Sequence, residues 1–158
     1  IAEAVGVGGL KYGILKESRT TDIVFDWKKM LDLTGDSGPY LQYSFARLRS
    51  IVRKSEARSS KFEMGFAELH QEHDLRLMRK ILEFPDEVAR SAEILQTNNL
   101  ANYLYQLAVL ANRFYETTPV LKEENAERRA ALLALIETAT SVLKTGLGLL
   151  GIRTPERI

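Results

Sequence analysis

The 158-residue sequence contains no cysteine, which excludes disulfide bonds, thiolate metal sites and a cysteine nucleophile. It has only two histidines, His70 and His73, and their spacing differs from the four-residue step of zinc-binding HExxH and HxxEH motifs. No run of about 18 or more apolar residues is present, so no transmembrane helix is predicted. A basic segment followed by an apolar one, as in a secretory signal, is also missing. The net charge is only +1, a value that gives no indication of a nucleic-acid partner.

What is present is the composition of an ordinary globular protein, 45% hydrophobic and 27% charged. The length allows one domain, or one domain with an appendage. The sequence begins at Ile1 without a methionine, in the middle of an apolar stretch. We therefore expect a fragment of a longer protein.

The first quarter of the sequence gives mixed secondary-structure signals. Residues 1–16 are apolar with some helical spacing, but four glycines weaken a helix prediction there and favour close packing. Residues 22–27 are β-branched at their centre, which indicates an extended segment or the entry to a helix. The segment 34–39, Thr-Gly-Asp-Ser-Gly-Pro, carries the strongest loop signal of the sequence and predicts a boundary there.

Everything after Pro39 has the apolar periodicity of α-helices. Pro39 and Pro85 each suit the first turn of a helix, and Asn98 or Asn99 is predicted to cap another. The last helix is apolar around much of its circumference, so we expect it at the centre of the fold. The expected helices cover about residues 39–57, 64–82, 85–95, 98–119 and 124–147. The predicted fold class is therefore all-α, a bundle of about five main helices.

A search for a reaction centre finds none. The glycines at residues 6–9 are too closely spaced for a GxGxxG loop and lack the lysine-serine pair of a P-loop. No GxSxG nucleophile motif occurs. Asp22 and Asp26 are the most plausible paired carboxylates, but in an extended segment they would not converge. His70 and His73 fit a solvated helix face better than a metal site.

The helix after Pro39 combines aromatic and basic side chains on one face. These side chains recur at intervals of three, four and seven residues, beside the apolar stripe of the same helix: Tyr40, Tyr43, Arg47 and Lys54. Arg49, Arg53 and Arg58 add positive charge on the flank. Residues 44–61 contain six basic residues and one acidic residue, a local charge of +5 that the net charge conceals.

Aromatic rings interleaved with arginines suit single-stranded RNA, whose bases stack on the rings while guanidinium groups reach the phosphates. Other interpretations remain open on periodicity alone. Tyr40 and Tyr43 could instead close the rim of the bundle, with the arginines merely solvating the helix. The basic face could also bind a protein or an anionic lipid. In that case the chain would be an α-helical interaction module without RNA binding, and a small enzyme is a further alternative.

Three stretches of the sequence resemble the C-terminal part of arginyl-tRNA synthetases. The first comprises VGGLKY at residues 7–12 and SRTTDIVFDW at residues 18–27. The second is GDSGPYLQYSFARLRS at residues 35–50, and the third is LLGIRTPERI at residues 149–158. Their order and spacing match those of the family, and the resemblance extends over essentially the whole chain.

The resemblance implies an all-α anticodon-binding domain of a class I synthetase at residues 35–158, preceded at residues 1–34 by the end of the catalytic domain. The partners it implies are the tRNA(Arg) anticodon stem-loop and the rest of the synthetase chain. ATP and Mg would be used by the parent's catalytic domain, and no cofactor is expected in this fragment. The family's HIGH and KMSK-type motifs would lie upstream, so these residues alone are not expected to aminoacylate. A monomer acting in cytoplasmic protein synthesis, without a membrane, is expected.

The resemblance also implies roles for individual residues. Tyr40, Tyr43 and Arg47 match family positions that contact the anticodon loop, and Arg49 lies beside them. Tyr115 resembles another aromatic near that loop, whereas Pro119 replaces a second aromatic of some members. Ile158 stands where the family usually ends in methionine. The remaining expected RNA contacts are Arg53 and Lys54 to phosphates, and Lys11 and Tyr12 to the inner side of the tRNA.

Overall fold

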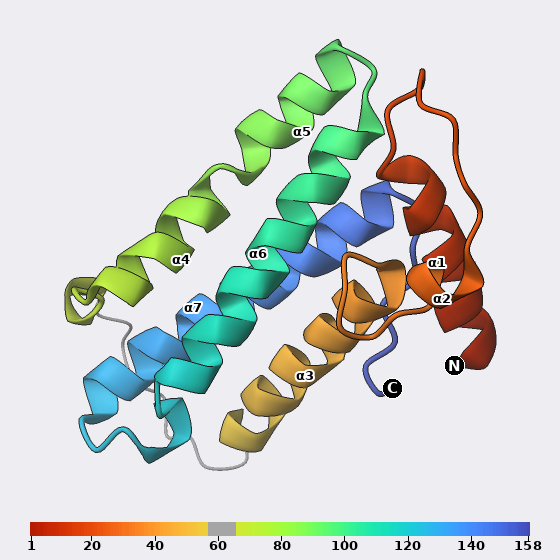
Figure 1. Ribbon diagram of the computed structural model, residues 1–158. Helices are drawn as coiled ribbons and strands as arrows, with labels where there is room; N and C mark the ends of the chain where they lie inside the picture. Colours follow the sequence, from red (N-terminus) through yellow and green to blue (C-terminus); the bar gives the residue numbers. More distant parts are fainter. Residues whose placement is uncertain (57–65) are drawn as a thin grey trace.

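The computed structural model describes residues 1–56 and 66–158 and is helical throughout its regular parts (Figure 1). No strand occurs in these two ranges, and the predicted all-α class is confirmed. The helices are α1 (Ala2–Leu15), α2 (Trp27–Met30), α3 (Gly38–Glu56), η1 (Phe66–Glu68), α4 (Glu72–Leu82), α5 (Phe84–Glu93), α6 (Thr97–Thr117), η2 (Val120–Lys122) and α7 (Ala126–Leu149).

Helix α7 is central, as its sequence predicts. It packs against α3, α4 and α6, while α5 continues the line of α4 along α6 and α1 lies against α3 (Figure 1). Leu132, Leu143 and Leu147 of α7 are fully buried. By length and composition α7 is apolar enough to cross a membrane, but 56% of that apolar window is buried inside the protein. It is therefore the core helix of this bundle.

Helix α1 forms in spite of its glycines, because these residues let it approach its neighbours closely. A Cβ atom on Gly8 would lie 2.6 Å from the Nε2 atom of Gln42 in α3. A Cβ atom on Gly38, the first residue of α3, would lie 2.4 Å from the carbonyl oxygen of Gly8. The expectation that small residues serve close packing here is confirmed. The segment is helical although its four glycines weaken the prediction of a helix, because close packing offsets their low helix propensity.

Several predicted helix ends require correction. The start of the second predicted helix, residues 64–65, lies outside the described residues; within them the α-helix begins at Glu72, since Leu69 and His70 lie outside any helix. Helix α6 already begins at Thr97, so Asn98 and Asn99 lie in its first turn and do not cap it. Residues 22–25 are irregular and lead into α2. The division at residues 34 and 35 stays a prediction.

A buried ion pair joins α4 to α7. The carboxylate of Asp74 has no exposed surface, and the Nη1 and Nη2 atoms of Arg128 both lie 3.2 Å from its Oδ2 atom. The same guanidinium donates to the carbonyl oxygen of Glu68 and lies 3.5 Å from Oε2 of Glu123. Because charges buried in this way must keep their partners, the pair fixes the position of α4 on the bundle.

Candidate nucleic-acid interface

The outer face of α3 presents the aromatic and basic side chains that the sequence singled out. Tyr43 is 43% exposed, and Lys54 is also exposed. Arg47, one turn beyond Tyr43, is half-buried. Because they are separated by four and seven residues, the three side chains point to the same side of the helix. Arg58 and Lys61, which contribute to the local positive charge, lie outside the described residues.

Helix α6 adds Tyr115 and Glu116 to this face. The guanidinium carbon of Arg47 lies 5.5 Å from the centre of the Tyr115 ring, which is within cation–π distance. The Nη1 atom of Arg47 donates to Oε1 of Glu116 at 3.0 Å. The structure thus brings together Arg47 and Tyr115, which are 68 positions apart. Glu116 was not anticipated, because nothing in the local sequence shows that its carboxylate faces α3.

Tyr40 has a different environment from Tyr43. It is half-buried, and its hydroxyl accepts a hydrogen bond from Nδ2 of Asn112 at 3.2 Å. Its ring lies 5.7 Å from that of Tyr105, centre to centre. Asn112 also donates to Oγ of Ser44 at 2.8 Å, so this network holds α3 against α6. Tyr40 therefore supports the face on which Tyr43 is exposed, and its contact with RNA stays a prediction.

The C-terminal residues run beside α3 on its other flank. Oε1 of Glu156 lies 3.8 Å from Nε of Arg49. Ile158 is 46% exposed. Arg53 follows Arg49 by one turn and is half-buried. These positions are compatible with the expected RNA contacts of Arg49, Arg53 and Ile158, which stay predictions.

Tyr12 does not lie on the surface, and its expected contact with RNA is wrong. Its side chain is fully buried, and its hydroxyl donates to Oδ1 of Asp36 at 2.6 Å and lies 3.2 Å from the carbonyl oxygen of Ala101. Burial is the main cause that raises the pKa of Tyr12 far above its ordinary value, and the hydrogen bond to Asp36 is the second cause. Lys11 is exposed and donates to the carbonyl oxygen of Gly151 at 2.6 Å, just beyond α7. Its RNA contact is still a prediction.

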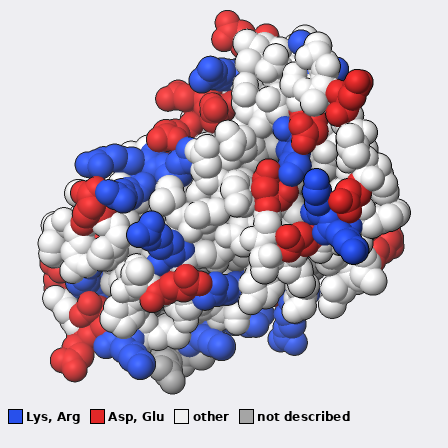
Figure 2. Space-filling model, viewed as in Figure 1, with Lys and Arg blue, Asp and Glu red and all other residues white. Residues whose placement is uncertain are grey.

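Charge is distributed unevenly over the surface. Figure 2 shows several basic side chains along α4 and across the neighbouring part of α6, with acidic groups between them. Over α1 and α2, on the opposite side of this view, basic and acidic side chains alternate. The net charge of +1 is therefore the sum of local groups of opposite sign.

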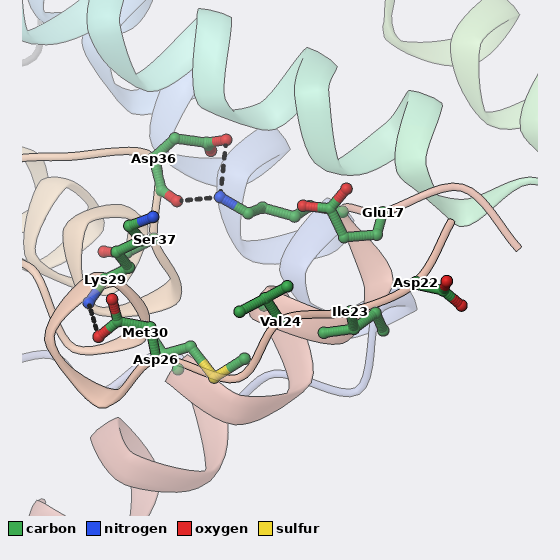
Figure 3. A pocket seen from close by; sticks show the side chains of 12 residues that line it. Glu17, Asp22, Ile23, Val24, Asp26, Lys29, Met30, Asp36 and Ser37 are labelled. Atoms are coloured by element: carbon green, nitrogen blue, oxygen red, sulfur yellow. Dashed lines mark hydrogen bonds and ion pairs between the residues drawn. The ribbon is translucent and has the colours of Figure 1, made fainter. Parts of the chain in front are cut away.

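A cavity of about 250 Å³ lies between α1 and the segment 22–37 (Figure 3). Asp22 and Asp26 both line it, but they lie at its opposite ends and do not converge. Oδ1 of Asp26 accepts a hydrogen bond from the backbone N–H of Lys28 at 2.9 Å and so caps α2. Lys16 donates to the carbonyl oxygen of Asp36 at 2.8 Å. Lys16 thus joins this segment to the end of α1, whereas Asp26 caps a helix within it, and Asp22 and Asp26 do not form a pair of carboxylates.

The parts of the chain that the structure describes contain no group of three or more His, Cys, Asp or Glu side chains that could hold a metal ion. Nε2 of His73 lies 3.4 Å from Oδ1 of Asp74, and its ring packs 5.7 Å from that of Phe114. His70 is exposed and separate from them. The two histidines thus have different surroundings and do not form one site.

Comparisons with known proteins agree with this architecture. The chain is 40% identical to the arginine–tRNA ligase of Sodalis glossinidius and 37% identical to that of Escherichia coli O139:H28, over 158 residues in each case. These residues are 100% of this chain and 27% of each relative, so the chain spans about a quarter of their length.

Solved structures give the same result. The arginyl-tRNA synthetase of Thermus thermophilus superposes with a TM-score of 0.90 at 31% identity, over 99% of this chain and 27% of that one. The enzyme of Plasmodium falciparum gives a TM-score of 0.83 at 29% identity, over 99% of this chain and 28% of that one. The family described as DALR anticodon binding domain matches residues 41–158. The resemblance noted in the sequence is confirmed, and the chain belongs to the DALR anticodon binding domain family.

Proposed function

We propose that this chain is the anticodon-binding part of an arginine–tRNA ligase, and that the face between α3 and α6 binds the anticodon stem-loop of tRNA(Arg). The observation that carries the proposal is the assembly of Tyr43, Arg47 and Tyr115 on that face, inside the segment that matches the family. An exposed ring, a guanidinium and a second ring are the groups that unstacked RNA bases and their phosphates require.

Each residue of the face has a distinct task. The exposed ring of Tyr43 stacks on an anticodon base, a contact typically worth ~1–3 kcal/mol. The guanidinium of Arg47 is in cation–π contact with the Tyr115 ring, and its N–H groups donate to a phosphate or a base edge. In the absence of RNA, Nη1 of Arg47 donates to Glu116. Binding then exchanges the Glu116 carboxylate for a phosphate.

The remaining cations of α3 act through charge. Lys54 lies on the same side of α3 as Arg47, whereas Arg49 and Arg53 carry positive charge on the side that borders the C-terminal residues. If about four phosphates are neutralised, the slope of log K against log salt is ~−2.8, with a factor of −0.7 for each phosphate of a single strand.

Arginylation itself belongs to the rest of the enzyme in this proposal. ATP and Mg bind to the catalytic domain, outside these residues, and the anticodon contacts favour a productive position of the distant acceptor end. The chain acts as a monomer in cytoplasmic protein synthesis, and light scattering on a sizing column tests its oligomeric state.

The test is a titration of a fluorescently labelled tRNA(Arg) anticodon stem-loop with the 158-residue chain. Tyr43→Ala is expected to weaken binding about tenfold, from the loss of one stacked base. Trp27→Ala is the matched control, because Trp27 is 59% exposed but lies on α2. A stem-loop with the same stem and a scrambled loop is the RNA control. Equal affinity for the two loops, or for Tyr43→Ala and the parent chain, would contradict the proposal.

A further inference from the structure

Gln42 lies one residue before Tyr43 but faces the interior of the protein, with no exposed surface. Its side-chain Nε2 atom donates to the carbonyl oxygen of Ala4 at 2.9 Å and to that of Arg153 at 2.7 Å. Both hydrogens of the amide are therefore used. One buried side chain of α3 joins two segments from opposite ends of the sequence.

The surroundings of Gln42 are shaped for this amide. Gly8 of α1 faces it, and any side chain there would collide with the Gln42 amide, since a Cβ atom would lie 2.6 Å from Nε2. The Oε1 atom of Gln42 is buried and has no hydrogen-bond partner. A buried polar atom without a partner is unfavourable, so packing alone would be better served by an apolar residue. The two hydrogen bonds from Nε2 are the contribution that an apolar residue would lack.

The second of these bonds places the C-terminal tail, which we define as residues 151–158. Arg153 is held at Gln42, and three residues later Glu156 lies 3.8 Å from Arg49. Seven helical residues from Gln42 to Arg49 rise about 10.5 Å, and three extended residues span about 10 Å. The tail therefore follows α3 in the same direction, and Figure 1 shows the C-terminus beside this helix.

The tail thereby borders the candidate RNA-binding face. At about 100° per residue, Gln42 and Arg49 lie on the same side of α3, and Tyr43 and Arg47 are about 100–140° around the helix from Gln42. Tyr115 of α6 lies on the far side of Arg47. The face formed by Tyr43 and Arg47 is consequently enclosed by α6 on one side and by the tail on the other.

We propose that Gln42 is a positioning residue for RNA binding: by holding Arg153, it fixes the C-terminal tail as one wall of the anticodon site. This inference rests on the proposed function. Ile152, at the start of the tail, is buried in the core. Two other contacts link the tail to α1, the hydrogen bond from Lys11 to Gly151 and the ion pair between Glu3 and Arg153. Both are exposed, and exposed polar contacts contribute little. Beyond Ile152, the Gln42 amide is thus the main anchor of the tail.

The test is a double-mutant cycle in the 158-residue chain, with affinity for the tRNA(Arg) anticodon stem-loop as the readout. Gln42→Met keeps the length of the side chain and removes both donors. It is expected to weaken binding about fivefold, the effect of losing the one hydrogen bond that holds Arg153. Deletion of residues 155–158 is expected to weaken binding at least as much. If Gln42 acts through the tail, Gln42→Met has no further effect in the shortened chain.

Thr140→Val is the matched control, because it removes another buried side-chain donor within α7, remote from the tail. It is expected to leave RNA affinity unchanged. The order of the tail is measured in parallel, without RNA, by heteronuclear NOE of residues 153–158, which is expected to fall in Gln42→Met. If Gln42→Met does not fold, Gln42→Leu enters the same cycle, since leucine also lacks both donors and is smaller.

Two results would overturn the inference. One is unchanged affinity of the Gln42 variant. The other is an equal loss of affinity in the full and the shortened chain, which would mean that Gln42 acts independently of the tail. Failure of the unmodified chain to bind the stem-loop overturns the proposed function instead. The heteronuclear NOE then still decides whether Gln42 holds the tail.

Discussion

Removal of the Glu116 carboxylate is expected to strengthen RNA binding. In the absence of RNA, Oε1 of Glu116 accepts a hydrogen bond from Nη1 of Arg47 at 3.0 Å, with 58% of the glutamate side chain exposed. A phosphate that binds Arg47 must replace this carboxylate. Glu116→Gln keeps the shape of the side chain and removes only its charge, so it isolates the electrostatic part of the competition.

The size of the effect follows from two contributions. An exposed ion pair of this kind stabilises the chain without RNA by ~0.5 kcal/mol. Because Glu116→Gln lacks this ion pair, RNA binding no longer has to break it. A carboxylate about 7 Å from the bound phosphate also repels it by ~0.6 kcal/mol in a water-like dielectric. Their sum of about 1 kcal/mol corresponds to an affinity gain of about fivefold.

The assay is the same stem-loop titration, carried out at two salt concentrations. Glu93→Gln at the end of α5 is the control, because it makes the same change of charge away from Arg47. The gain of Glu116→Gln is expected to shrink at high salt, where the repulsion is screened. Weaker binding by Glu116→Gln would refute the reasoning, since it would show that the carboxylate orients Arg47 for RNA and does not compete with it.

Three further predictions concern the scaffold. Arg128→Met leaves Asp74 as a buried charge without its main partner, and is expected to lower the free energy of unfolding in urea by ~3–5 kcal/mol; Arg128→Met with Asp74→Leu should recover most of it. Gly38→Ala places a Cβ atom 2.4 Å from the backbone oxygen of Gly8, and is expected to cost ~1–3 kcal/mol in the same assay. Because the pKa of Tyr12 is raised in the folded state, the unfolded state loses this proton first, and stability falls as pH rises above about 10. Tyr12→Phe should reduce that alkaline loss in thermal unfolding, and an unchanged pH profile would contradict the assignment.

Periodicity predicts the helices after Pro39 well, because each buries one apolar stripe in the same core. The exception is the start of α4. Leu69 is buried and has the spacing of that stripe, although it lies outside any helix. Helix α1 is only weakly predicted, since its glycines make contacts with Gln42 and Gly38 that no propensity scale contains. The sequence thus shows an apolar stripe that packs on the core, but it does not show which neighbour a glycine will face.

The residues of the candidate site also differ in whether the local sequence predicts them. Tyr43 and Arg47 follow from the spacing on one helix, whereas Tyr115 came from resemblance, because its approach to Arg47 depends on the packing of α6. The same packing turns Tyr12 into a fully buried residue, although it stands beside the exposed Lys11 in the sequence. The linkage of Gln42 to Arg153 joins positions 111 residues apart and has no local signature.

Ion pairs on the candidate face give a physical reason for the near-neutral net charge. Arg47 faces Glu116 and Arg49 faces Glu156, so arginines of the candidate face lie near carboxylates from other segments. Each of these carboxylates competes with an incoming phosphate for its arginine, and so weakens the attraction for any polyanion that cannot replace it in the same geometry. A face built in this way favours an RNA of defined shape over nonspecific phosphate, and a low net charge is the expected consequence.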